Sequence, residues 1–428
     1  MNDKLKRLVV TTPQGPSGML DKASRFVFNY TTTERASEVS LGMPIQVESY
    51  GSSVLHPVFA MNRPEGYLLD RIRNKFGKLM QLNDMRLLAL TGANQIGRLR
   101  YAEPNAENKR LRTGIGLTTI LESEDSNELF EYLVDTYLTS GISGFQPKVM
   151  IPNEEMLARQ PAKTMPGERA TVIAPDLIVK ASGEDYPHLA QNEFLCMDAA
   201  RRAGLTVPEF WLSESGKLFV MSRFDLVSDQ QLGFEDMVVL MNRSNEEKYL
   251  GSYEQIAKVI NAYCGEHAPE SCRRFFEYLA LTVLVRNGDA HLKNFGLLYE
   301  DPHTAPPKLS PLFDVVTTTI YKYQNKHGVE LADRELAIKL AKSKRYPDRK
   351  TLIEFGRNVC GVAKPEEVLQ RISDAMADTL KVHGPNMHPE LTKEMRREWD
   401  GGRLAMATDE VYRRAVVEGV SGPIQGPM

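Results

Sequence analysis

Three oxygen-bearing side chains in the second half of the chain have the types and spacing that a metal-assisted reaction needs. Asp289 stands five residues before Asn294 in the string RNGDAHLKNFGLLY, and Asp314 follows in PLFD. Asn294 can offer a neutral oxygen, and Asp314 a charged one, to a hard cation such as magnesium. Asp289 can orient a hydroxyl group and accept its proton. We therefore expect one site in which Asp289 is the catalytic base and Asn294 and Asp314 are the metal ligands.

Regular elements on either side of these residues would bring them together. Apolar residues recur with helical spacing along Arg273 to Arg286, and Asn287-Gly288 ends the pattern just before Asp289. FGLLY and KLSPL have the composition of strands on either side of the loop EDPHTAPP. A hairpin here would carry Asp314 back beside Asn294. Taken alone, an Asp–Asn pair is more typical of a turn and a helix cap.

Upstream segments supply groups that bind a polyphosphate. The loop Ser140 to Lys148 (SGISGFQPK) lies between a predicted helix, Asn127 to Thr139, and a predicted strand, Lys148 to Ile151. Its glycines leave backbone amides accessible to phosphate oxygens. DLIVK is typical of a strand that presents Lys180, and Glu193 lies near the start of the helix that follows. KLFVMSRFD indicates a strand that leads into a segment between two lobes.

The order of these groups along the chain is the order found in protein kinases. A loop, a lysine, a glutamate, a connecting segment, the Asp–Asn pair and a final aspartate follow one another. Ordinary surface charge would explain Lys180 or Glu193 taken singly. The order as a whole predicts phosphoryl transfer from ATP with magnesium.

Composition and charge argue against several classes of protein. A net charge of -3 and a pI near 6.3 argue against general binding to nucleic acid or to an anionic membrane. No run of 18 apolar residues occurs, so we expect a soluble, cytoplasmic protein with no membrane partner. The four cysteines form no CxxC pair and lie among apolar residues, which predicts buried thiols and not a zinc site.

The length of 428 residues predicts more than one domain. Strands are expected at Arg7 to Thr12 and Arg25 to Tyr30, joined by the turn PQGPSG, with helices at Glu65 to Phe76 and Asp84 to Leu90. Polar EPNAENKRLRTG suits a linker, and helices dominate from about residue 230. We predict an N-terminal α+β unit over 1–105, a part with the phosphate loop over 106–228, and a helical part over 229–428.

With these segments in view, the chain resembles the HipA family, bacterial serine/threonine kinases known as toxins. The likeness spans nearly the whole length, and its most specific string is Asp-x-His-x-Lys-Asn. It is carried by the SLGMPIQ region, SGISGFQPK, DLIVK, NEF, SRFD, NGDAHLKN and PLFDVV. It implies an α+β, bilobal, protein-kinase-like fold with a family-specific N-terminal subdomain and a mostly helical C-terminal lobe.

The resemblance also implies ATP and magnesium as cofactors, with ATP between the loop, the lysine and the connecting segment. The implied nucleotide-binding residues are Ser143, Gly144, Phe145, Gln146, Pro147, Lys148, Lys180, Glu193, Ser222, Arg223, Phe224, His291, Leu292, Lys293, Asn294 and Asp314.

Two departures from the kinase and family patterns bear on the site. His291 stands where ordinary kinases carry a lysine, so positive charge near the γ-phosphate is expected from Lys293 or His291. Where the family commonly has an inhibitory phosphoserine, two residues before Ser143, this chain has Gly141. Ser143 then becomes the candidate for autophosphorylation, ahead of Ser140, although a plain turn serine explains it equally well.

The resemblance further implies the toxin of a toxin–antitoxin pair, whose partners are a HipB-like helix-turn-helix antitoxin, a protein substrate such as an aminoacyl-tRNA synthetase, and operator DNA reached through the antitoxin. Two alternatives stay open: a catalytically silent co-repressor, and a small-molecule kinase with the same Asp-x4-Asn spacing. The basic stretch Lys339 to Lys350 either lies along operator phosphates or, as charge runs usually do, forms a solvated helix face.

Overall fold

The computed structural model describes residues 5–77, 80–106, 114–138, 146–154, 176–183, 185–227, 230–324 and 330–407. The chain divides into two compact units. Unit 1 comprises Met1–Ala190, Glu209–Asn245 and Leu298–Ala305, and unit 2 comprises Gln191–Pro208, Glu246–Leu297 and Pro306–Met428. We describe each unit by itself. The predicted division into three parts stays a prediction.

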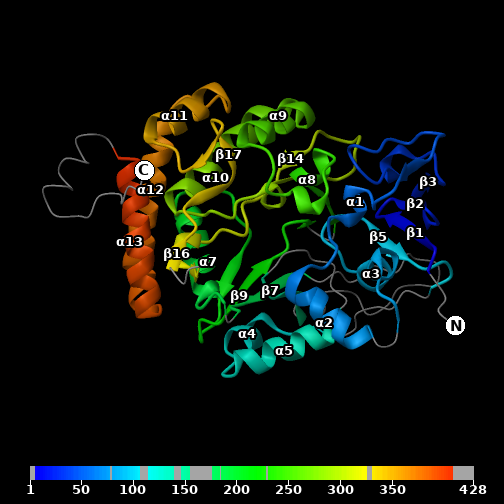
Figure 1. Cartoon of the computed structure of the whole chain (residues 1–428), viewed down its shortest axis with the longest axis horizontal. Helices are drawn as coiled ribbons and strands as arrows, with labels where there is room; N and C mark the ends of the chain where they lie inside the picture. Colours follow the sequence, from blue (N-terminus) through cyan, green and yellow to red (C-terminus); the bar gives the residue numbers. More distant parts are fainter. Residues whose placement is uncertain are drawn as a thin grey trace, which may run out of the picture. The chain divides into compact units, whose positions relative to one another are not determined.

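Unit 1 begins with a five-stranded antiparallel sheet in the order β4-β3-β2-β1-β5 (Figure 1). Its strands are β1 (Arg7–Thr12), β2 (Gly15–Lys22), β3 (Phe26–Tyr30), β4 (Tyr50–Ser52) and β5 (Arg100–Ala102). Burial alternates along β1, where Leu8 and Val10 are buried, as expected for a sheet with one covered face. The predicted turn PQGPSG is wrong in extent. Only Pro13-Gln14 turn, because the following residues form β2 and pair with β1.

This first part contains three helices, of which the periodicity of the sequence predicted the last two. They are α1 (Pro57–Ala60), α2 (Gly66–Phe76) and α3 (Asp84–Thr91), with a short 3-10 turn η1 (Arg35–Ser37) before them. Asn83 caps α3 by accepting a hydrogen bond from the backbone N–H of Arg86, which gives that helix its start.

A second sheet in unit 1 has the order β6-β7-β9-β8. Its strands are β6 (Lys148–Ile151), β7 (Leu177–Ala181), β8 (Phe210–Leu212) and β9 (Leu218–Ser222). The helices α4 (Leu117–Leu121) and α5 (Ser126–Thr136) precede it in the chain, and α5 confirms the helix expected there. The remaining elements of unit 1 are β10 (Leu226–Val227), β11 (Gln230–Gln231), β12 (Gly233–Asp236) and α8 (Met237–Leu240).

Unit 2 is mostly helical, as predicted for the later part of the chain. Its long helices are α7 (Leu189–Arg202), which begins two residues inside unit 1, α9 (Tyr253–Tyr263), α10 (Ala268–Leu284), α11 (Arg349–Asn358), α12 (Pro365–His383) and α13 (Pro389–Ala405). A capping box starts α9, where the Gln255 side chain accepts a hydrogen bond from the Ser252 N–H. The short 3-10 turns are η2 (Asn245–Glu247), η3 (Gly265–His267), η4 (Leu292–Asn294), η5 (Thr318–Ile320) and η6 (Gly384–Asn386).

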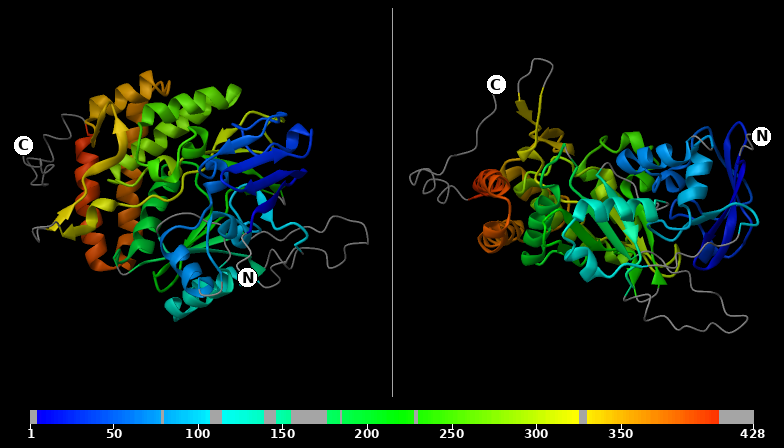
Figure 2. Two further views of the ribbon diagram at one scale, coloured as in Figure 1. Left: turned by 45° about the vertical axis from the view of Figure 1, so that its right-hand side comes forward. Right: turned by 90° about the horizontal axis from the view of Figure 1, so that it is seen from below.

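Helix α10 is the centre of unit 2. Phe275, Phe276, Leu279 and Leu284 are fully buried, and its polar Glu277 is buried too. Such a helix, apolar on nearly all sides, must be covered by neighbours. It packs against α9, α11, α12 and α13, and α12 and α13 lie side by side in two views (Figure 2). The end of α10, where the site begins, is therefore rigidly held.

Short strands complete unit 2. They are β14 (Lys308–Leu309), β15 (Lys322–Gln324), β16 (Glu330–Ala332), β17 (Glu335–Leu340) and β18 (Ser343–Arg345), and β13 (Gly296–Tyr299) contains a boundary between the units. The interpretation of Lys339 to Lys350 as a helix face is wrong. Most of that stretch is the β17–β18 hairpin, whose turn residues Ala341 and Lys342 have positive φ angles, and α11 starts only at Arg349.

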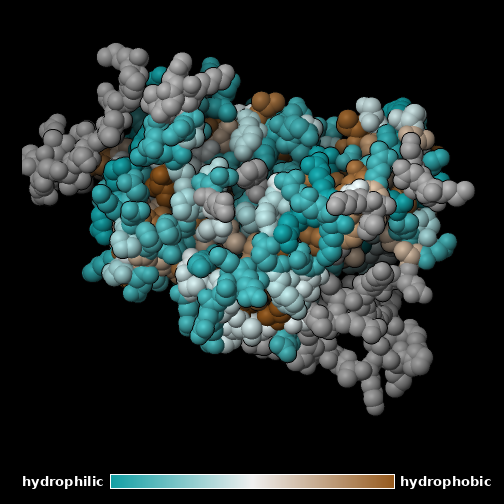
Figure 3. All heavy atoms as spheres, turned by 60° about the horizontal axis from the view of Figure 1, so that its bottom comes forward, coloured by the Kyte–Doolittle hydropathy of each residue, from teal (hydrophilic) through white to brown (hydrophobic). Residues whose placement is uncertain are grey.

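No helix among the described residues is long and apolar enough to span a membrane. The face of the molecule in Figure 3 is mostly hydrophilic, with apolar side chains scattered over it. All four cysteines are buried and free, as predicted. Burial raises the pKa of each thiol, to about 12 for Cys196 and about 11 for Cys264, so these cysteines are unreactive packing groups.

Candidate active site

The loop that carries Asp289 follows directly from the buried helix α10. The chain leaves the helix through Arg286, which has a φ of 60°, and Asn287 then accepts a hydrogen bond from the Asp289 N–H at 3.0 Å. The Asp289 side chain is exposed, while its neighbours Ala290 and Leu292 are buried. The buried hydroxyl of Tyr253 donates to the Ala290 carbonyl at 2.9 Å. A fixed backbone thus presents an exposed carboxylate, as a catalytic base requires.

Asn294 and Asp314 lie together, as predicted for the metal ligands. Asn294 Nδ2 donates to Asp314 Oδ2 at 3.1 Å. Asn294 Oδ1 accepts the N–H of His291 at 3.0 Å, and an amide oxygen has a second lone pair for a cation. The expected return of the chain occurs, because the Ser310 N–H after β14 donates to the carbonyl of Gly296 at 2.9 Å.

Asp314 adopts a backbone conformation that few non-glycine residues accept. Its φ is 61°, in the left-handed region, which aspartate tolerates better than most residues. Strained backbone of this kind is concentrated at ligand-binding and catalytic sites. The side-chain oxygens of Asn294 and Asp314 are the type that magnesium prefers, so this pair fits such an ion.

Tyr249 contacts the predicted base, and no pattern in the sequence pointed to it. Its hydroxyl donates to Asp289 Oδ1 at 2.8 Å, and its ring meets the ring of His291 edge-on with 5.0 Å between centroids. The carbonyl of Lys248 accepts the N–H of Leu292 at 3.1 Å, which holds the two loops together. The tyrosine side chain is 41% exposed, so an incoming molecule can reach it.

Positive charge was expected from Lys293 or His291, and the burial of His291 argues for the lysine. Burial, assisted by the nearby charge of Lys248, lowers the pKa of His291 to about 3, so the ring is neutral at pH 7. Its Nδ1 is buried and makes no hydrogen bond with the described residues. Of the two residues expected to bring positive charge, Lys293 is left, half-buried in η4 next to Asn294.

Two lysines of unit 1 lie directly opposite each other in the β6–β7–β9 sheet. Lys148 of β6 pairs with Lys180 of β7, which pairs with Phe219 of β9. Opposite residues in antiparallel strands point to the same face, so the two lysine side chains lie on one face of the sheet. Both lysines are buried, with exposed fractions of 6% and 2%, and Lys180 Nζ lies 5.7 Å from the Phe219 ring centre. Concentrated positive charge of this kind suits a polyphosphate.

The other predicted contacts are placed as follows. Ser143, Gly144 and Phe145 lie outside the described residues, so the phosphate loop and the candidate autophosphorylation serine stay predictions. Gln146 and Pro147 precede β6, and the Pro147 carbonyl accepts the N–H of Ala181 at 3.0 Å. Glu193 is buried in α7. It belongs to unit 2 and Lys180 to unit 1, so their pairing stays a prediction.

The segment Ser222 to Phe224 follows β9 as expected, but the Arg223 side chain is already engaged. It is fully buried and forms a bidentate ion pair with Asp225, at 2.5 and 2.9 Å, and it donates to the Gln95 carbonyl. The Arg223 N–H donates to the Asp176 carbonyl at 2.8 Å. Any nucleotide contact here therefore falls to other groups of the segment.

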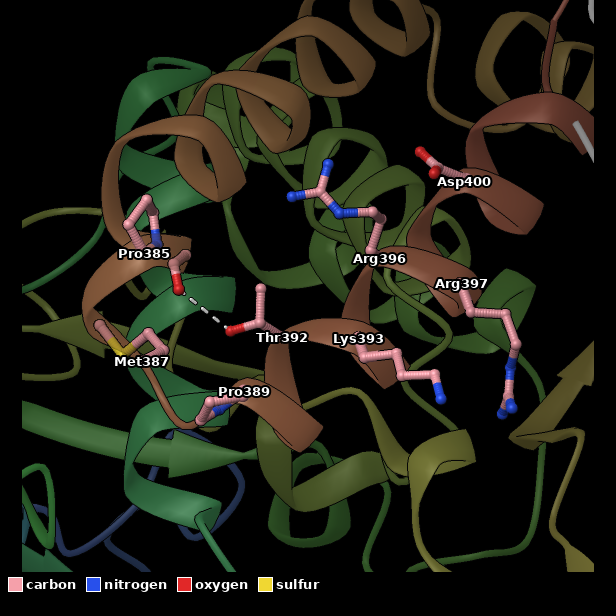
Figure 4. Close-up of a pocket in the computed structure, with 9 residues that line it drawn as sticks. Pro385, Met387, Pro389, Thr392, Lys393, Arg396, Arg397 and Asp400 are labelled. Atoms are coloured by element: carbon pink, nitrogen blue, oxygen red, sulfur yellow. Dashed lines mark hydrogen bonds between the residues drawn. The ribbon is translucent and has the colours of Figure 1, made fainter.

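A surface hollow of about 620 Å³ lies at the start of α13, away from these residues in the sequence (Figure 4). Lys393, Arg396 and Arg397 are among the residues that line it, and the Thr392 hydroxyl donates to the carbonyl of Gly384 beside it at 3.2 Å. It contains none of the predicted site residues, and its exposed cations provide no base or metal ligand.

Comparison with known proteins now places the chain. The model of the HipA-like C-terminal domain matches residues 140–382, and the model of the HipA N-terminal domain matches 8–102. The chain belongs to the HipA family. HipA in the solved complex of HipA, HipB and operator DNA from Shewanella oneidensis MR-1 aligns over 96% of this chain and 99% of its own, with a TM-score of 0.68 and 17% identity. The predicted α+β, kinase-like fold is confirmed.

Curated relatives of this HipA-family chain carry kinase names. "Putative kinase Y4dM" of Sinorhizobium fredii is 28% identical over 251 residues, which are 52% of this chain and 58% of that protein. A "Putative kinase" of Haemophilus influenzae is 32% identical over 196 residues, 42% of this chain and 53% of that protein. The chain thus spans little more than half the length of these relatives.

Proposed function

We propose that this protein is a serine/threonine protein kinase of the HipA type that uses ATP and magnesium. The observation that carries the proposal is the grouping in unit 2, where Asn294 Nδ2 lies 3.1 Å from Asp314 Oδ2 and Asp289 stands exposed at the start of the same loop. Asp289 would take the proton of an acceptor hydroxyl as that oxygen attacks the γ-phosphorus and ADP leaves.

The cofactors follow from the donor set. Asn294 and Asp314 would hold magnesium, which when bound neutralises phosphate charge. The buried pair Lys148 and Lys180 would bind phosphate oxygens of ATP. Because His291 is neutral, Lys293 is the cation of this loop that would face the transferred group.

Two substitutions test the proposal with radiolabelled ATP, magnesium chloride and lysate proteins as acceptors. Asp289→Asn keeps the shape of the side chain but removes the base, so we expect turnover to fall by about 10²-fold or more. Asp314→Asn should abolish magnesium-dependent ATP binding or transfer. Asp378→Asn, on the exposed face of α12, is the matched control and should behave as the wild type. Wild-type turnover in the Asp289 variant would refute the assignment.

The biological role proposed with this activity is that of a toxin. The HipA of Shewanella oneidensis was solved with HipB and operator DNA. By analogy this chain would pair with a HipB-like helix-turn-helix antitoxin, reach operator DNA through it, and phosphorylate a translation factor such as an aminoacyl-tRNA synthetase. Expression of the chain should then arrest growth, and Asp289→Asn should lift the arrest. Arrest that persists in this variant would favour a role without catalysis.

The β17–β18 hairpin is the surface we assign to operator phosphates in that complex. Lys342 and Arg345 are exposed, and Lys344 is half-buried. Replacing all three with glutamine should reduce the slope of log affinity against log salt by roughly 0.9 for each lost phosphate contact. Operator binding is measured with the antitoxin present. An unchanged slope would remove the hairpin from the DNA interface.

A further inference from the structure

The segment just after Asp314 contains three consecutive threonines, Thr317, Thr318 and Thr319, here called the threonine run. Thr317 and Thr319 are buried, and all three hydroxyls form hydrogen bonds within the protein. Each connects the run to another part of unit 2. Since Asp314 lies only three residues earlier, whatever holds the run also holds the predicted metal ligand.

Thr318 connects the run to the loop of the predicted base. Its Oγ1 accepts the N–H of Gly288 at 2.7 Å and donates to the carbonyl of Arg286 at 3.1 Å. Its own N–H donates to the same carbonyl at 3.2 Å. Gly288 is the residue before Asp289, and a Cβ there would come within 2.6 Å of the carbonyl oxygen of Glu335. One threonine therefore fixes the backbone of the base relative to the segment of the metal ligand.

Thr317 and Thr319 connect the run to helix α13. Trp399 Nε1 donates to Thr317 Oγ1 at 2.8 Å, and Thr319 Oγ1 donates to Glu398 Oε2 at 2.9 Å. Trp399 is fully buried, and Glu398 is 4% exposed. Arg334 completes the contact with two hydrogen bonds to Glu398, at 2.9 and 3.1 Å. A buried carboxylate with an arginine partner and a hydroxyl donor is a rigid anchor.

Helix α13 also touches the other end of the site, where α10 gives way to the loop of Asp289. A Cβ at Gly402 would come within 2.0 Å of the Leu284 carbonyl oxygen, so the two helices approach at a distance that only glycine allows. Arg286 Nη2 donates to the carbonyl of Gly401 at 3.3 Å. The family model ends at residue 382, and α13 begins at Pro389, after it.

We propose that α13 is a positioning element of the active site, which acts through Thr318, Glu398 and Trp399 to fix Asp289 and Asp314 relative to each other. None of these three residues would touch ATP or the acceptor. The proposal rests on the kinase function proposed above only for its catalytic consequence. The structural consequence is that α13 restrains the backbone of the Asp289 loop, and it can be tested without measuring any activity.

Two variants and one rescue test the contact of Thr318. Thr318→Val keeps the shape but leaves the Gly288 N–H without its acceptor, whereas Thr318→Ser keeps the hydroxyl. We expect Thr318→Val to lower kcat about tenfold or more and to raise the magnesium concentration needed for half-maximal rate, with little change in KM for ATP. Thr318→Ser should restore most of the rate. A merely structural role would lower the yield of folded protein and leave both kinetic quantities of the folded fraction unchanged.

Glu398→Gln tests the connection to α13, and the matched control is Lys393→Ala with Arg396→Ala, on the exposed side of the same helix (Figure 4). Hydrogen exchange of the amides over 286–294 is measured in the full chain without nucleotide. We expect faster exchange in Glu398→Gln and Thr318→Val, and wild-type exchange in the control. If the wild type transfers no phosphate but the exchange changes as expected, the kinase proposal fails and the positioning role stands. Unchanged exchange in both variants overturns the role of α13.

Discussion

At the scale of single residues, the environment of each side chain decides its chemistry more than its type does. Asp289 and Asp314 are both aspartates next to a turn. Asp289 is exposed and accepts a hydrogen bond from the Tyr249 hydroxyl, whereas Asp314 accepts one from the Asn294 amide and has a strained backbone. His291 matches the family string but is buried and neutral. The sequence left open whether Lys293 or His291 brings the positive charge, because the spacing of a motif carries no information about burial.

Tyr249 leads to a prediction at this scale. Its hydroxyl donates a hydrogen bond to Asp289 Oδ1 and would compete with an acceptor hydroxyl at that oxygen. Tyr249→Phe removes that competitor and keeps the ring, so we expect kcat/KM for the acceptor to rise roughly two- to tenfold, the range of one partly exposed hydrogen bond. Initial rates at low acceptor concentration measure this. A fall in kcat with unchanged KM would mean that the hydroxyl orients the base.

At the scale of elements, the positions of the chemical groups follow from strand register and helix ends. The register Lys148–Lys180–Phe219 places two lysines on one face of a sheet, and the end of α10 places Asp289. Two ammonium groups on one face can both contact the oxygens of a bound polyphosphate.

The lysine pair gives the second prediction. ATP with magnesium should raise the melting temperature of the wild type, because it binds the folded state alone. In Lys148→Met and Lys180→Met that increase should shrink or disappear, because each variant removes a cation that would contact phosphate. Thermal unfolding of each variant with and without nucleotide measures the increase. Lys217→Met, an exposed lysine before β9, is the matched control. An undiminished increase in the lysine variants would contradict a role in phosphate binding.

At the scale of the whole molecule, each unit contains a histidine that is neutral at pH 7, half-buried His56 in unit 1 and buried His291 in unit 2. Burial lowers the pKa of His56 in unit 1 to about 4 and that of His291 in unit 2 to about 3, both below the ordinary value of 6.5. Between the folded pKa and pH 6.5, each histidine therefore binds a proton in the unfolded chain but not in the folded chain. The stability contributed by each neutral ring is complete above pH 6.5 and is lost as the pH falls toward the folded pKa.

Because of this proton linkage, the stability of the protein should fall with acid. Between pH 6.5 and about 4, each histidine should lower the free energy of unfolding by about 1.4 kcal/mol per pH unit. Urea unfolding at several pH values measures the slope. His56→Asn and His291→Asn should each flatten it, and the double variant should flatten it further. A slope that none of these variants changes would place the acid sensitivity in other groups.

Much of the fold and the local site was accessible from the sequence. Periodicity marked α2, α3, α5 and α10, because burial of one helical face leaves its pattern in the chain, and apolar strand-forming residues marked β6 and β7. The Asp289–Asn294 spacing and the hairpin predicted that Asp314 would return beside Asn294, since only a short connection separates them. The turn PQGPSG and the helix face at Lys339 to Lys350 were wrong, because glycine and charge are compatible with strands that pair locally.

What the chain by itself determined is the identity and the order of the chemical groups. What only the tertiary structure decided is their surroundings: the neutrality of His291, the hydrogen bond from Tyr249 to Asp289, and the hydrogen bonds between α13 and the threonine run. The partners in these contacts are separated by up to 82 residues, as Trp399 is from Thr317. Contacts over such distances arise from the packing of whole helices, and no local pattern of residues encodes them.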